Sequence, residues 1–148
     1  MPGDTDLVKL YSGRILELAA EIPQVGRLDS PMATVKKRSP LCGSTVTVDL
    51  DMTDGKISRF AQDVKACALG QASASVLGAV AIGRTEAEIL AARKALKSML
   101  TEDGPVPDAP FDGYEALLPA RDFRNRHASI MLALDATAEA IAEAQAAA

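Results

Sequence analysis

Residues 45–55 read TVTVDLDMTDG, and this stretch decides the fold class of the 148-residue chain. Apolar side chains at positions 46, 48, 50 and 52 alternate with polar ones, which is the period of a strand with one buried and one wet face. Asp54-Gly55 predicts a tight hairpin turn, because glycine tolerates the positive φ that such turns require. With a return strand over residues 56–64 and an edge strand over residues 33–38, the sequence predicts a small three-stranded antiparallel sheet.

Helices are predicted before and after this sheet. Thr85 and Glu88 have the spacing of a capping box, in which each side chain bonds the other residue's backbone N–H at a helix start. Pro119 is expected to stop a short helix over residues 114–117. The predicted helices begin near residues 4, 67, 85, 114 and 125. We therefore predict one α+β domain over residues 1–148, with helices packed on one face of the sheet.

Composition excludes several classes of function. The net charge is −4 and aromatic residues make up 3% of the chain, which argues against a surface that tracks phosphates or stacks on bases. No apolar run reaches the roughly 20 residues that a membrane span requires. The acidic N-terminus lacks the layout of an export signal, so we expect a cytoplasmic protein with reduced cysteines. Partners among nucleic acids and membranes are not expected.

Three side chains are candidate metal ligands: Cys42, Cys67 and His127, the chain's only cysteines and its only histidine. Cys67 is predicted at a helix N-terminus, where the helix dipole favours a thiolate, and Lys65 adds positive charge nearby. Two thiolates and an imidazole suit zinc or an iron–sulfur cluster, once a fourth ligand is added. A buried cysteine is also often a small apolar residue, and no C-x-x-C spacing is present, so the residues alone leave both interpretations open.

Enzyme chemistry finds no support in the pattern. His127 is the one imidazole base available, and no nucleophile stands at a recognisable spacing from it. No glycine-rich phosphate loop follows a predicted strand. We therefore expect a protein that is not an enzyme.

Residues 10–142 resemble the U-type iron–sulfur cluster scaffold family, the group of IscU, SufU and the NifU N-terminal domain. The resemblance is carried by a Leu-Tyr-x-x-x-Ile-Leu helix at residues 10–16, PLCG at 40–43, CALGQASAS at 67–75 and RHASI at 126–130. Two departures stand out. Ser44 replaces the family's aspartate, and a third cysteine is absent, with either His127 or Ala128 at its position.

The resemblance implies a scaffold that assembles or carries a transient [2Fe–2S] cluster, or holds zinc, through Cys42, Cys67 and His127. It implies a cysteine desulfurase and apo iron–sulfur proteins as partners, and a homodimer as an assembly state. One alternative is a sulfur acceptor that activates a desulfurase while zinc occupies the site. Another is a structural zinc-binding domain, which chelation would destabilise.

Overall fold

A computed structural model describes residues 12–40 and 43–147 of the chain. Its sheet contains β1 (Ala33–Arg38), β2 (Thr45–Thr53) and β3 (Lys56–Lys65), in the antiparallel order β1-β2-β3. Asp54 and Gly55 both have positive φ, 53° and 77°, as a type I′ hairpin turn requires. The predicted three-stranded antiparallel sheet is confirmed.

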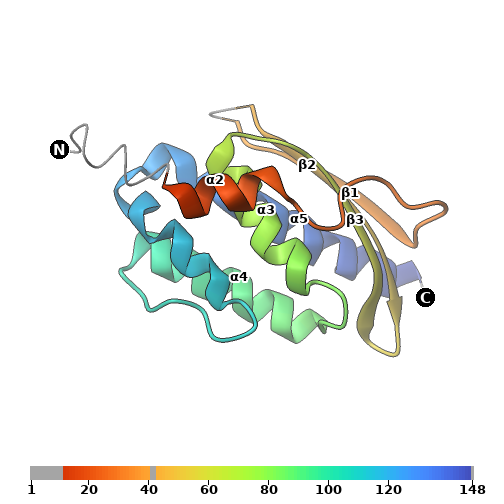
Figure 1. Cartoon of the computed structure of the whole chain (residues 1–148). Helices are drawn as coiled ribbons and strands as arrows, with labels where there is room; N and C mark the ends of the chain where they lie inside the picture. The colour runs from red at the N-terminus through yellow and green to blue at the C-terminus, as the bar shows by residue number, and fades with distance from the viewer. Residues whose placement is uncertain (1–11, 41–42, 148) are drawn as a thin grey trace.

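The helices gather on one side of this sheet (Figure 1). They are α2 (Gly13–Ala20), α3 (Ala68–Val80), α4 (Glu86–Thr101), the 3-10 helix η1 (Asp112–Asp122) and α5 (Arg124–Ala147). The longest, α5, packs across β1 and β2 on one flank and against α3 and α4 on the other. The buried apolar side chains of β2 therefore meet α5, and the α+β class is confirmed.

The predicted helix boundaries have three different outcomes. The predicted start of the first helix, at residue 4 or 5, lies outside the described residues, and α2 begins at Gly13 with Ser12 as its cap. The capping box at Thr85 and Glu88 is confirmed. The helix expected to stop before Pro119 instead runs through it to Asp122. It does so as a 3-10 helix, which avoids the clash that a proline ring makes with the carbonyl four residues back in an α-helix.

One polar side chain on β2 departs from the simple alternation. Asp49 points away from the helices, yet its side chain has no exposed surface. The connector between α2 and β1 covers it, and Arg27, Leu28 and Thr34 all donate hydrogen bonds to its carboxylate. The outer face of the sheet is thus partly buried by a loop that a buried carboxylate holds in place.

Small residues let α3 approach its neighbours closely. A Cβ on Gly78 would lie 2.7 Å from both Gln62 Nε2 and the Pro23 carbonyl oxygen. A Cβ on Gly70 would lie 2.6 Å from Ser129 Oγ of α5. This close packing brings the N-terminus of α3 against the first turns of α5, where the candidate site lies.

Candidate functional site

Cys67 is the N-cap residue of α3, as the sequence predicts. Its backbone is extended, with φ −65° and ψ 168°, and its side chain forms no capping hydrogen bond. The thiol is free and half-buried at the positive end of the helix dipole. A sulfur in this position is partly accessible to an incoming metal ion.

A hydroxyl group that sequence reasoning did not identify lies beside this thiol. The Cys67 Sγ is 3.5 Å from Ser129 Oγ, and Ser129 Oγ lies 3.0 Å from Ser44 Oγ. Both serines are almost completely buried, Ser129 at 1% exposure and Ser44 at 3%. Cys67, Ser129 and Ser44 thus form a continuous chain of polar atoms from the surface inward.

Ser44 also places the β1–β2 loop at this end of the molecule. Ser39 N–H donates to the Ser44 carbonyl at 2.8 Å, and Gly43 N–H donates to the Ser39 carbonyl at 3.0 Å. Gly43 has φ +69°, the left-handed conformation that glycine adopts without strain. Cys42 itself lies outside the described residues, and Ser44, two positions after it, belongs to the polar chain at Cys67.

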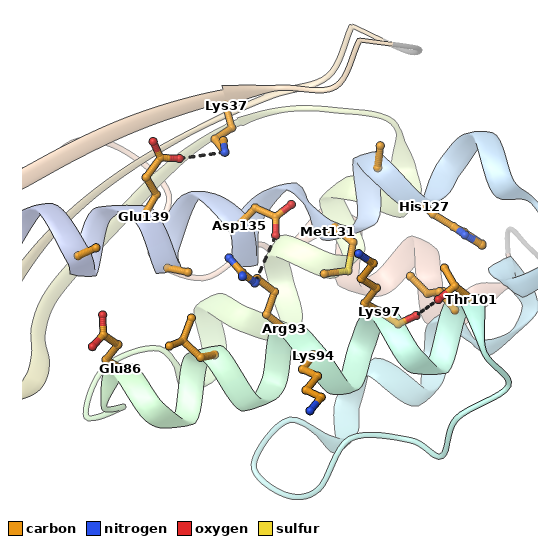
Figure 2. A pocket seen from close by; sticks show the side chains of 15 residues that line it. Lys37, Glu86, Arg93, Lys94, Lys97, Thr101, His127, Met131, Asp135 and Glu139 are labelled. Atoms are coloured by element: carbon orange, nitrogen blue, oxygen red, sulfur yellow. Dashed lines mark hydrogen bonds and ion pairs between the residues drawn. The ribbon is translucent and has the colours of Figure 1, made fainter.

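His127 faces a different part of the molecule. Its Nε2 lies 2.9 Å from the Ala120 carbonyl oxygen, and because a carbonyl only accepts, Nε2 carries the proton. In the neutral ring, Nδ1 then carries the lone pair that a metal would use. The ring lines a groove of ≈1090 Å³ between α4 and α5, and Figure 2 shows it at one end of that groove.

The groove has its own charge pattern. Lys37 pairs with Glu139 at 2.9 Å and Arg93 lies 3.9 Å from Asp135. Burial raises the pKa of Asp135, although Arg93, Lys37 and Lys97 act in the opposite direction. The first pair joins β1 to α5 and the second joins α4 to α5 (Figure 2), so His127 stands in a charged surface groove.

Helix geometry explains why Ser129 rather than His127 contacts Cys67. Two residues apart on α5, they point about 200° apart around the helix axis. Ser129 faces α3 and Cys67, whereas His127 faces η1 and the groove. The two-residue spacing of His127 and Ser129 is visible in the sequence and places them on opposite sides of a helix. It predicts which of them contacts Cys67 only once the side of α5 that meets α3 is known.

The donors near Cys67 suit a soft metal only in part. Across residues 12–40 and 43–147, no three His, Cys, Asp or Glu side chains converge as a metal-binding group. A thiol with two hydroxyls behind it supplies one strong ligand. A metal held at Cys67 therefore requires further ligands, and Cys42 is the thiol whose neighbouring backbone lies at this site.

No helix of the described part of the chain is long and apolar enough to span a membrane.

Comparison with known proteins assigns the chain to a family. No protein-family model and no curated protein sequence matches it. Among solved structures, it is similar to the N-terminal part of a nitrogen-fixing NifU-like protein from Brucella abortus, with 45% identity and a TM-score of 0.93. That match covers 97% of this chain and 99% of the other.

Two more distant structures share the fold. One is a putative iron–sulfur cluster assembly scaffold protein for the SUF system from Fervidobacterium islandicum, with 20% identity and a TM-score of 0.80 over 90% of this chain and 98% of that one. The other is a hypothetical protein with 24% identity and a TM-score of 0.78 over 91% and 98%. The whole-length match at 45% identity and the Cys67 helix motif together show that the chain belongs to the U-type, NifU-like scaffold family.

Proposed function

We propose that this chain, as a single cytoplasmic domain over residues 1–148, assembles or carries a transient iron–sulfur cluster, [2Fe–2S] in type. The cluster is cargo, bound by the thiolates of Cys42 and Cys67 and passed on. The chain acts as a carrier and not as an enzyme. The observation that carries the proposal is the Cys67 thiol, half-buried at the N-terminus of α3 in a chain of the NifU-like family.

His127 is the proposed third ligand. Its Nε2–H bond to Ala120 leaves Nδ1 as the coordinating atom, an arrangement common among metal-binding histidines. Because the described His127 ring lines the α4–α5 groove, this ligation requires residues 124–127 to move toward Cys67 while residues 129 and 130 stay packed on α3. Ser44, where related proteins have aspartate, leaves the fourth position to water, a partner or a second copy of this chain.

The partners follow from this chemistry. A cysteine desulfurase supplies the sulfur for the cluster, and apo iron–sulfur proteins receive the product. A half-exposed thiol at Cys67 also suits a sulfur acceptor, which would hold persulfide while zinc leaves the site. That second function predicts sulfane sulfur without a lasting cluster.

The deciding experiment measures iron, acid-labile sulfide and the visible spectrum. The protein is purified without oxygen and incubated with iron, cysteine and a desulfurase. We expect near-stoichiometric iron and sulfide with charge-transfer bands, all lost in Cys42→Ser and in Cys67→Ser. Serine is a better N-cap than cysteine, so Cys67→Ser should keep α3 folded and test the ligand alone.

Each alternative gives a distinct result. Stoichiometric sulfane sulfur, faster desulfurase turnover and no cluster would replace the scaffold with the sulfur acceptor. Zinc that resists exchange, together with a lower melting temperature after chelation, would indicate a structural zinc site. Full metal content in both cysteine variants would contradict all three interpretations.

A further inference from the structure

The buried hydroxyl pair behind Cys67 is positioned by packing and not by chance contact. Ser129 fills the space left by Gly70, whose missing Cβ would stand 2.6 Å from Ser129 Oγ. The next residue along α5, Ile130, accepts a hydrogen bond from Ser73 of α3 at 2.6 Å. Residues 129 and 130 of α5 are therefore held against α3, and Ser129 Oγ has little freedom to move away from the sulfur.

The hydrogen bond between Cys67 Sγ and Ser129 Oγ can run in either direction. Each serine hydroxyl has one proton to donate and can accept in return. With a free thiol, Cys67 S–H donates to Ser129, which donates to Ser44. A metal-bound sulfur has released its proton to water and can only accept, so Ser129 then donates to the sulfur. Rotation of the Ser129 hydroxyl group makes this change, because its oxygen already lies 3.5 Å from the sulfur.

We propose that Ser129 is a positioning residue for the Cys67 sulfur, and that its hydroxyl, supported by Ser44, donates a hydrogen bond to that sulfur when it binds metal. This inference rests on the proposed function of Cys67 as a ligand. Groups that hydrogen-bond a metal ligand from behind orient it and tune its electron density, and losing one costs about 10–100-fold in metal affinity. The geometry thus gives Ser129 a role in ligation that requires no contact with the metal.

The test uses the full chain, with zinc affinity measured by competition and cobalt(II) as the spectroscopic probe. Ser129→Ala is expected to weaken zinc binding about 10–100-fold. It should also move the sulfur-to-cobalt charge-transfer band to lower energy, because a sulfur without its hydrogen bond is more electron-rich. Ser44→Ala should produce a smaller change of the same sign, because the Ser129 donor remains.

Ser73→Ala is the matched control, since it removes another buried hydroxyl that joins α3 to α5. It should lower stability by a similar amount and leave the cobalt band and the zinc affinity unchanged. Equal zinc affinity and an unshifted band in Ser129→Ala would overturn the inference while the Cys67 ligand stands. Zinc binding that survives in Cys67→Ser would overturn the proposed function and this inference with it.

Discussion

Asp49→Asn tests the buried carboxylate that holds the connector between α2 and β1 on the outer face of the sheet. The carboxylate accepts from Arg27 Nε at 2.6 Å, Arg27 Nη2 at 3.1 Å, Leu28 N–H at 3.1 Å and Thr34 Oγ1 at 2.6 Å. Asparagine has nearly the same shape but only one accepting oxygen. Its NH₂ group must face at least one of these donors.

The expected loss of stability depends on which of these donors can bind water in place of the carboxylate. Arg27 is 55% exposed, so its side chain can be resolvated and its ion pair contributes little. The Leu28 backbone N–H cannot rotate away, and a hydrogen bond to a charged acceptor contributes about 1.5–3 kcal/mol. The asparagine NH₂ group facing one of the former donors adds a further cost. We therefore expect Asp49→Asn to lower the free energy of unfolding by about 2–4 kcal/mol. With an unfolding entropy of about 2.1 cal/mol/K per residue, this lowers Tm by roughly 6–13 °C.

Urea and thermal unfolding at pH 7 measure this loss, with Asp51→Asn as the matched control. Asp51 lies on the same strand and bonds Arg59 and the Met32 N–H, but its side chain is 18% exposed. We expect this control to lose about 1 kcal/mol. If Asp49→Asn loses no more than Asp51→Asn, burial of the carboxylate does not hold the connector.

The pH dependence gives an independent check. Burial alone would raise the pKa of Asp49, but hydrogen bonds from Arg27, Thr34 and Leu28 outweigh it and leave the pKa below 3.8. A lowered folded-state pKa means that the stabilisation is fully present above the unfolded value and is lost as pH falls through the folded one. The difference between wild type and Asp49→Asn should therefore shrink below about pH 3.8.

Three further variants test other parts of the structure. Gly78→Ala places a carbon 2.7 Å from a backbone oxygen and should cost about 1–3 kcal/mol in urea unfolding, whereas Gly13→Ala, with open space around it, should be neutral or slightly stabilising. Asp135→Asn should raise Tm at pH 7, because burial raises the pKa of Asp135 and its ionised form therefore costs stability. The gain in Tm should vanish below pH 3.8, where the carboxyl group is protonated in the folded and the unfolded state. A gain that stays unchanged in acid would contradict this cause. His127→Ala should reduce metal retention if His127 is a ligand, and retention equal to wild type would leave the two cysteines as the chain's ligands.

Local sequence patterns alone determine the hairpin and the helix start at Cys67. Alternation over residues 46–52 and the Asp54-Gly55 turn are properties of neighbouring residues, so the hairpin follows from them. The position of Cys67 at a helix start is equally local, because small helix-forming residues follow it directly. Pro119 shows the limit of such patterns, since a proline that would end an α-helix fits the 3-10 turns that the chain adopts there.

Only the tertiary structure decided which side chains meet. Asp49 reads as a solvent-facing residue of an alternating strand, and it is buried because a connector some twenty residues earlier crosses that face. Ser129 becomes the neighbour of Cys67, 62 residues away, because Gly70 lets α5 approach α3 along one side. A helical sequence specifies which residues share a face, but the partner of that face depends on packing between distant segments, and so the position of Ser129 beside the thiol could not be predicted from the sequence.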